Sequence, residues 1–305
     1  MDELPFVSVV IPTHNRKDKL IRLIKSILQS NYPKERLEII VVDDASTDGT
    51  YKEVRKKFPE VKIIRNEKEV LLAKSRNIGI ESSKGKYVFL IDDDNIVDRD
   101  CIQYLVKVME SDSKIGVAGP LMLYYSNPMK IWCAGGKLNI FLRPYHFLKG
   151  KYITEINLPD IIENIDYFPN AYMVRKEICE KVQHDNIDFP HNWEEQDFCI
   201  RVKRLGYKIV TVTSAKVWHD IDYDGYITRL GVFKTYDQAK SRIIFLKKYG
   251  NSLQRLMFWL IIFPISTIYY IYKILTTSSE SKILLLRSYW KGTVDGIKWR
   301  GQKWD

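Results

Sequence analysis

Residues 87–95 read YVFLIDDDN, an apolar run followed at once by three adjacent carboxylates. The run Tyr87–Ile91 is rich in β-branched and aromatic side chains, which is typical of a buried strand. Three neighbouring carboxylates repel one another, so a partner must hold Asp92, Asp93 and Asp94 in place. Mg²⁺ and Mn²⁺ take oxygen ligands of this kind and also bind diphosphate oxygens. Because alternate residues of an extended chain point to one side, the pattern predicts Asp92 and Asp94 as metal ligands. The alternative is a solvated acidic loop.

Outward from this stretch, apolar strands alternate with helical patterns over some 120 residues. Strands are expected at 6–11, 37–42, 61–64, 87–91 and 115–118, with a later one at 208–212, and helices at 17–28, 46–58, 71–82 and 99–111. This alternation predicts an α/β fold with a Rossmann-like, mainly parallel sheet flanked by helices. Ligands of such sheets bind at the carboxyl ends of the strands. Polar clusters follow three of the expected strands there, at 13–15, 43–44 and 92–95.

The net charge of +10 is concentrated in the last quarter of the chain. Residues 1–230 hold 35 Lys and Arg against 34 Asp and Glu, whereas residues 231–305 hold 13 against 4. The sequence therefore predicts one domain over 1–230 and a second, basic and helical segment over 231–305. Such a segment favours an anionic partner, either lipid headgroups or nucleic acid.

The basic segment contains Leu256–Tyr272, a run of 17 residues without a charge, with Pro264 in its middle. A second apolar patch, 283–286, precedes Trp290, Trp299 and Trp304, which alternate with Lys and Arg. Aromatic and basic residues together suit the headgroup zone of a membrane. Three arrangements remain open: two short helices lying in the interface, a spanning helix, or a soluble helix packed on the first domain. The favoured expectation is peripheral or shallow insertion, with proline separating two short helices.

The expected location is the cytoplasmic face of the cell membrane. The first five residues, MDELP, are acidic and lack the basic start and apolar core of a signal peptide. The four cysteines form no C-x-x-C pair, which favours reduced thiols in a cytosolic compartment.

Further candidates for chemistry lie outside the acidic run. Asp44 ends an expected strand and is interpreted either as a helix cap or as an acceptor for a nucleobase imide. Arg76 suits bidentate binding of a diphosphate, or is a residue of a basic helix surface. His219 suits a transition metal, although a lone histidine is more often structural.

Residues 193–197, WEEQD, open an expected helix. Glu194 and Glu195 project about 100° apart on a helix, so only one of them can face a given point. Transfer of a group to a hydroxyl needs one carboxylate to take the hydroxyl proton, and Glu195 is favoured over Glu194 for this role. Asp197 and Arg201, four residues apart, are expected to pair with each other.

Six motifs together resemble the inverting family 2 glycosyltransferases of GT-A fold: VSVVIPTHNR, VVDDASTDGT, SRNIGI, FLIDDDN, GPLMLYYSNP and WEEQDFCIRVKRLGYKI. They cover roughly residues 6–220 in the family's order. The resemblance implies a nucleotide-diphospho-sugar donor, a divalent cation (Mn²⁺ or Mg²⁺), and hexosyl or deoxyhexosyl transfer to a glycan or lipid-linked acceptor.

The resemblance also assigns roles to single residues. It implies donor binding by Pro12, Thr13, Asn15, Asp44, Arg76 and Asp93, metal binding by Asp92, Asp94 and His219, and base catalysis by Glu195, with Glu194 as the alternative. Two positions depart from the family's pattern. The base is Glu where the family often has Asp, and residues 66–70 read NEKEV where the family usually has glycines.

Two other functions compete with sugar transfer. A nucleotidyltransferase that makes the nucleotide-sugar would share the sheet and the carboxylates, but it would normally have a Gly-rich, basic loop where this chain has PTHNR. A nucleic-acid-binding protein would use the basic tail, but the acidic clusters and the balanced charge of residues 1–230 disfavour it. No nucleic acid is therefore expected as a partner, whereas an anionic membrane surface is.

Overall fold

The computed structural model describes residues 4–221, 231–276 and 281–301. The chain divides into two compact units. Unit 1 comprises Met1–Lys137, His146–Asn186 and Glu195–Ile221, and unit 2 comprises Leu138–Tyr145, Ile187–Glu194 and Asp222–Asp305. The predicted domain boundary at residue 230 lies outside the described residues, as do residues 1–3 and Trp304, so these expectations stay predictions.

Unit 1 is built on a mixed sheet of ten described strands in the order β10-β12-β6-β11-β4-β1-β2-β3, with β5 pairing to β12 and β7 to β6. The strands are β1 (Val7–Thr13), β2 (Leu37–Asp43), β3 (Lys62–Arg65), β4 (Tyr87–Ile91), β5 (Asn95–Val97), β6 (Ile115–Tyr124), β7 (Ile131–Cys133), β10 (Ile161–Ile162), β11 (Ala171–Arg175) and β12 (Lys208–His219). The neighbours β3, β2, β1 and β4 run parallel, and β11 runs antiparallel beside β4. The predicted α/β architecture is confirmed.

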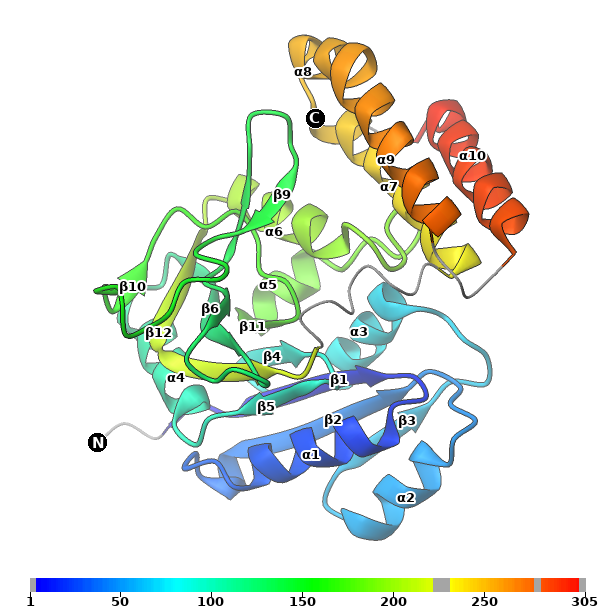
Figure 1. Cartoon of the computed structure of the whole chain (residues 1–305). Helices are drawn as coiled ribbons and strands as arrows, with labels where there is room; N and C mark the ends of the chain where they lie inside the picture. Colours follow the sequence, from blue (N-terminus) through cyan, green and yellow to red (C-terminus); the bar gives the residue numbers. More distant parts are fainter. Residues whose placement is uncertain (1–3, 222–230, 277–280, 302–305) are drawn as a thin grey trace. The chain divides into compact units, whose positions relative to one another are not determined.

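Helices cover both faces of this sheet (Figure 1). They are α1 (Lys17–Leu28), α2 (Thr50–Lys57), α3 (Leu72–Glu81), α4 (Cys101–Ser111), α5 (Lys176–Lys181) and α6 (Glu194–Arg204), with the single turn η1 (Lys34–Arg36). Alternation along β1 sets the two faces. Val9 belongs to the core cluster that includes the apolar face of α1. Val10 points the other way, against α3, where Gly79 leaves no room for a side chain. Glycine at 79 therefore lets α3 lie close to β1.

Two strands are longer than the sequence predicts. Strand β6 continues through Pro120 to Tyr124, and β12 continues through an irregular register near 212–216 to His219. The pairing of β6 with β11 stops at Ala118, and its pairing with β7 starts at Met122, so Pro120 needs no N–H on that side. The extension of β12 carries His219 toward the end of β4. A small hairpin of β8 (Gly136–Leu138) and β9 (Pro144–His146) completes the strands.

Unit 2 is mainly helical among its described residues. It contains α7 (Val232–Tyr249), α8 (Ser252–Met257), the π turn η2 (Phe258–Ile262), α9 (Phe263–Thr276) and α10 (Lys282–Lys298). Helix α10 packs on α7, and Gly292 and Gly296 let the two backbones approach because a Cβ at either position would meet the α7 backbone. Segment 187–194 joins this unit through Asp188, which accepts hydrogen bonds from Lys248 at 2.9 Å and from Trp299 at 2.7 Å.

The run Ser252–Thr276 forms one continuous helical stretch of 25 residues, long and apolar enough by length and composition to cross a membrane. The expectation that Pro264 divides this region into two short helices is wrong. The π turn η2 lies directly before the proline, where the wider turn accommodates the missing N–H and the pyrrolidine ring.

Candidate active site

The polar clusters predicted at the carboxyl ends of β1, β2 and β4 do converge. The parallel register pairs Thr13 with Asp43, and the β4 strand beside them ends at Ile91. After Ile91, Asp93 and Asp94 form a turn that leads into β5. The expectation that Asp92 and Asp94 share one side of an extended chain is therefore wrong, because this turn sends the two side chains to different partners.

Asp93 and Asp94 meet at Arg16, directly before α1. The guanidinium Nη1 of Arg16 lies 3.1 Å from Oδ1 of Asp93 and 3.0 Å from Oδ2 of Asp94. Thr13 donates its hydroxyl to Oδ2 of Asp93 at 2.7 Å. Burial raises the pKa of Asp93 to about 7, against the opposing charge of Arg16. One half-exposed guanidinium thus relieves the repulsion between two buried carboxylates.

Asp94 also faces His219, as the sequence predicts. Oδ1 of Asp94 lies 3.3 Å from Nε2 of His219, and the side chain of Asn170 lies 2.9 Å from the same nitrogen. Asn95 donates to Oδ1 of Asn170, which leaves the Asn170 amide nitrogen as the donor toward His219. Burial acts to raise the pKa of Asp94, but the neighbouring His219 ring and the charge of Arg16 hold this pKa below its ordinary value.

Asp92 points to Arg76 instead. The guanidinium of Arg76 is fully buried, and its Nη2 donates to Oδ1 of Asp92 at 2.7 Å and to Oε1 of Glu195 at 3.0 Å. The backbone N–H of Asn170 donates to the same Glu195 oxygen at 2.8 Å, and the N–H of Asp92 donates to the Asn170 carbonyl at 3.0 Å. Arg76 and Asn170 each bind both Glu195, the predicted base, and Asp92, the first residue of the acidic run. Arg76 is predicted as a diphosphate ligand; in this structure its guanidinium is buried and contacts Asp92 and Glu195.

The side chain of Asp44 closes the loop before α3. Its two oxygens accept hydrogen bonds from the Asn66 amide and from the backbone N–H groups of Val70 and Leu71, each at 2.8 Å. Leu71 has a left-handed φ of 71°. The loop at 66–70, which lacks the family's usual glycines, is held by hydrogen bonds to the Asp44 carboxylate. Leu71 follows it with a positive φ, a conformation that costs backbone strain. A nucleobase role for Asp44 stays a prediction.

Asn15 organises the neighbouring loop. Its side-chain oxygen accepts from the backbone N–H groups of Thr47 at 2.7 Å and Asp48 at 3.3 Å, and its own φ is 53°. Pro12 is buried within β1, opposite Val42 of β2. Pro12 therefore belongs to the sheet at the end of β1, and Asn15 ties the loop after β1 to the loop after β2.

The two glutamates at the start of α6 differ as expected from their 100° offset. Glu194 is buried, at 1% exposure, whereas the Glu195 side chain is 16% exposed and reaches Arg76. The predicted pair of Asp197 and Arg201 is confirmed, with Nη2 of Arg201 2.6 Å from Oδ2 of Asp197. This pair lies within α6 itself.

The side chains present fit a divalent cation as a two-residue site. Two ligand atoms at right angles, each about 2.1 Å from an ion, lie about 3.0 Å apart, close to the 3.3 Å between Asp94 and His219. Magnesium-type sites commonly use one or two protein ligands plus phosphate oxygens and water. Among the described residues, no group of three or more His, Cys, Asp or Glu is arranged to hold a metal ion. Asp92 does not join the pair in this structure.

The sequence-based prediction does not include two residues of this site. Arg16 directly follows THN and looks like an ordinary surface arginine before a helix. Asn170 lies between Pro169 and the strand β11, with a φ of 72° that asparagine tolerates better than most residues. Its position after a proline and before an apolar strand is a recognisable signal for a special backbone conformation.

Comparison with known proteins extends this picture. A family model described as glycosyl transferase family 2 matches residues 8–182, which is more than half of the chain. The probable glycosyltransferase YdaM of Bacillus subtilis is 29% identical over 237 residues, covering 72% of this chain and 51% of YdaM. Glycosyltransferase AglE of Haloferax volcanii is 26% identical over 174 residues, covering 55% of this chain and 57% of AglE. The chain thus spans about half the length of these relatives.

Two solved structures share the fold. The mannosyltransferase PcManGT of Pyrobaculum calidifontis, in complex with GDP-Man and Mn²⁺, aligns with a TM-score of 0.59 at 16% identity, covering 97% of this chain and 85% of that one. GalNAc-T7 with UDP, GalNAc and Mn²⁺ aligns with a TM-score of 0.62 at 17% identity, covering 88% and 59%. The family match includes Asp92, Asp93, Asp94 and Asn170, and it ends before Glu195. With this match, this sheet and this arrangement of strand ends, the chain belongs to glycosyl transferase family 2 and has the GT-A fold.

Proposed function

We propose that the chain transfers a hexosyl or deoxyhexosyl group from a nucleotide-diphospho-sugar to a hydroxyl of a glycan or lipid-linked acceptor, with inversion. The observation that carries the proposal is the hydrogen-bonded group of Glu195, Arg76, Asp92 and Asn170 at the carboxyl end of β4. It holds one partly exposed carboxylate at a fixed place beside the acidic run, where a donor would bind in a sheet of this type.

In this mechanism Glu195 takes the proton of the acceptor hydroxyl while that oxygen attacks the anomeric carbon. Arg76 and the Asn170 N–H hold Oε1 of Glu195, so the carboxylate is oriented before the acceptor arrives. The nucleoside diphosphate leaves from the opposite side of the sugar, which inverts the anomeric configuration.

Asp94 and His219 would hold the divalent cation, which supplies positive charge to the oxygens of the leaving diphosphate. Arg16 bridges Asp93 and Asp94 here, and a cation at Asp94 would take over part of that role. The freed guanidinium would then be a second cationic group near the diphosphate, while Thr13 keeps Asp93 in position.

A donor screen tests the reaction type. Full-length protein is incubated with UDP- and GDP-sugars and simple glycoside or lipid acceptors, with Mn²⁺ or with chelator. We expect release of a nucleoside diphosphate that depends on both metal and acceptor, in equal amount to a newly glycosylated product of inverted configuration. In a parallel incubation with a nucleoside triphosphate and a sugar 1-phosphate, release of inorganic diphosphate would identify a nucleotidyltransferase. In the donor screen, a product of retained configuration would contradict the role of Glu195.

We further propose that unit 2 holds the protein at the cytoplasmic face of the membrane, peripherally or with shallow insertion. Only 17% of the most apolar 18 residues of the Ser252–Thr276 run are buried. One side of this run packs within unit 2 through Phe258, Thr267 and Ile274, whereas the other side exposes apolar residues, with Ile268 at 70%. A helix that is apolar all round requires cover on every side, and acyl chains would cover the exposed one.

Shallow insertion agrees better with unit 2 than spanning does. The partner helix α7 carries five basic residues: Lys234, Lys240, Arg242, Lys247 and Lys248. If the long helical run crossed the bilayer, α7 charges packed beside it would enter the hydrocarbon region at a cost of several kcal/mol, about 2.5–3.5 for each such residue. In an interfacial arrangement the same charges meet anionic headgroups, at roughly 1 kcal/mol in favour for each.

Membrane fractionation checks this placement. We expect the protein in the membrane fraction, with release by alkaline carbonate or high salt. Replacing Ile268 by Glu should reduce the bound fraction strongly, because it puts a carboxylate on the exposed apolar face. Ile187→Glu is the matched control, since Ile187 is 79% exposed in the same unit but outside the long helical run. Retention after carbonate would favour a spanning helix, and a wholly soluble protein would exclude both arrangements.

A further inference from the structure

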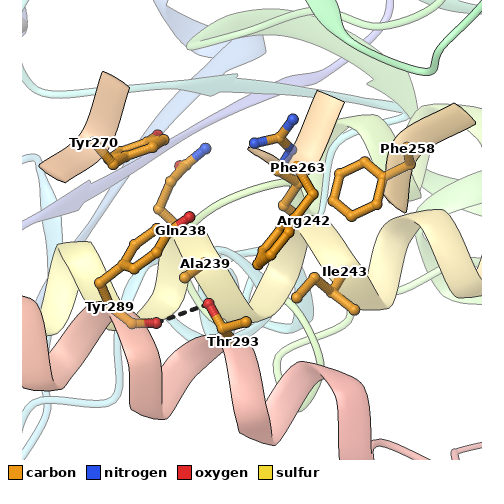
Figure 2. A pocket seen from close by; sticks show the side chains of 9 residues that line it. All are labelled: Gln238, Ala239, Arg242, Ile243, Phe258, Phe263, Tyr270, Tyr289 and Thr293. Carbon is orange, nitrogen blue, oxygen red and sulfur yellow. Dashed lines mark hydrogen bonds between the residues drawn. The ribbon is translucent and has the colours of Figure 1, made fainter. Parts of the chain in front are cut away.

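Unit 2 contains a small pocket between α7, η2, α9 and α10. Its lining combines four aromatic rings with one cation, from Gln238, Ala239, Arg242, Ile243, Phe258, Phe263, Tyr270, Tyr289 and Thr293 (Figure 2). The enclosed volume is about 10 Å³, room for about a single water molecule. The pocket is therefore too small to enclose a larger ligand, which could place only a compact group at the pocket's mouth.

Beside the hydroxyl groups of its tyrosines and Thr293, the pocket is lined by the longer polar side chains of Gln238 and Arg242, one turn apart on α7 (Figure 2). Among the described residues, neither the Gln238 amide nor the Arg242 guanidinium makes a hydrogen bond or ion pair. The guanidinium carbon of Arg242 lies 4.9 Å from the centre of the Phe258 ring. Burial lowers the pKa of Arg242, and the neighbouring Arg143 adds to this effect, yet an arginine stays charged at neutral pH.

A partly buried guanidinium among aromatic rings, with a second arginine nearby and no carboxylate partner in the described structure, favours an anion. The two side chains offer guanidinium and amide N–H donors from one helix face, which suits the several acceptor oxygens of a phosphate. Carboxylates of the protein do not take this place, although Asp237 and Asp295 lie on the same helices: Asp237 binds Asn192 and Ser241, and Asp295 binds Tyr236.

The surface around the pocket indicates what kind of molecule would carry this phosphate. The α9 surface next to Tyr270 exposes Ile265 at 63%, Ile268 at 70% and Tyr272 at 63%. A free phosphate would gain nothing from this apolar surface, whereas an acyl or isoprenoid chain would cover it. We propose that Arg242 and Gln238 form a binding site for the phosphate of a membrane lipid, whose hydrocarbon chain lies along the exposed face of α9. This site is separate from the transfer reaction and does not depend on it.

Titration with monomeric short-chain lipids tests the site without the general attraction of a charged vesicle. Full-length protein is titrated calorimetrically with dihexanoyl phosphatidic acid below its micelle concentration, with inorganic phosphate, and with dihexanoylglycerol. We expect saturable, one-to-one binding of the phosphatidic acid, at least tenfold tighter than either of the other two. Equal binding of inorganic phosphate would overturn the lipid assignment, and equal binding of dihexanoylglycerol would overturn the phosphate assignment.

Variants separate the site from overall charge. Arg242→Gln should weaken phosphatidic acid binding at least tenfold, whereas Arg287→Gln, which removes an equal charge from an exposed position on α10, should change it less than twofold. Gln238→Glu gives Arg242 an internal partner four residues away, so it should weaken binding at least tenfold while the melting temperature stays the same or rises. Unchanged binding in both Arg242→Gln and Gln238→Glu would overturn the proposal, even if one of them proved unstable.

Discussion

Replacement of Glu195 by glutamine should lower kcat by about 10²–10⁴-fold, the usual loss when general-base help is removed. Glutamine keeps the shape of the side chain and an oxygen that can accept from Arg76 and from the Asn170 N–H, so the site should keep its geometry. The variant lacks only the basicity that the acceptor proton requires. Donor affinity should change little, because the base acts on the acceptor.

The matched control is Glu194→Gln, one residue earlier on α6. Glu194 is buried, so its substitution is expected to affect stability and to leave the chemical step largely intact. Three measurements decide the outcome: kcat at saturating donor, nucleotide affinity by titration, and melting temperature. An inactive, folded Glu194→Gln beside an active Glu195→Gln would reverse the assignment of the base.

Chelation should abolish transfer, and Mn²⁺ or Mg²⁺ should restore it. Asp94→Asn should lower activity roughly 10³-fold even with metal present, since a bound cation typically supplies several kcal/mol of transition-state stabilisation and each 1.4 kcal/mol is tenfold in rate. Mn²⁺ binding, followed by electron paramagnetic resonance, should weaken in parallel. Asp18→Asn, an exposed carboxylate in the first turn of α1, is the control for loss of charge alone. Full activity in chelator would remove the metal from the mechanism.

Asp92 gives this experiment a second use. If Asp92 is a metal ligand, as the motif implies, Asp92→Asn should weaken Mn²⁺ binding as much as Asp94→Asn does. If its part is to hold Arg76, as the 2.7 Å ion pair indicates, Mn²⁺ binding should survive while catalysis falls. We expect the second result, because the turn at Asp93 and Asp94 directs Asp92 away from His219.

The elements whose pattern is purely local were predicted well. Helix α1 and strand β4 have the predicted bounds. The hydrophobic period of 3.6 residues identifies the helix, and a short run of β-branched and aromatic residues identifies the strand, without any knowledge of their neighbours. The predicted strands 115–118 and 208–212 end before β6 and β12 do: Gly119 and Pro120 interrupt the first pattern, and the register of β12 shifts between Val212 and Lys216. What allows each strand to continue is its set of partners across the sheet, and a single sequence does not show them.

The site divides in the same way. The family resemblance predicts Asp94, His219 and Glu195 as site residues. In the structure Asp94 contacts His219, and Glu195 contacts Arg76, both near the carboxyl end of β4. Motifs do not show what holds them. Asn170 acts through its carbonyl, its N–H and its amide at once, and two of these three groups are backbone atoms present in every residue. Arg16 acts through a contact some 77 residues away in the chain.

The π turn before Pro264 also sets the helical phase of everything after it. A π turn adds one residue relative to an α-helix, so α9 is rotated by about 100° from the orientation that an uninterrupted helix would have. With that rotation, Thr267 and Ile274 face the interior of unit 2, and Ile265, Ile268 and Tyr272 face outward. Deleting a single residue within Phe258–Ile262 would turn a different set of side chains outward without changing the composition of the helix. Chain length in this segment is therefore as constrained as its hydrophobicity.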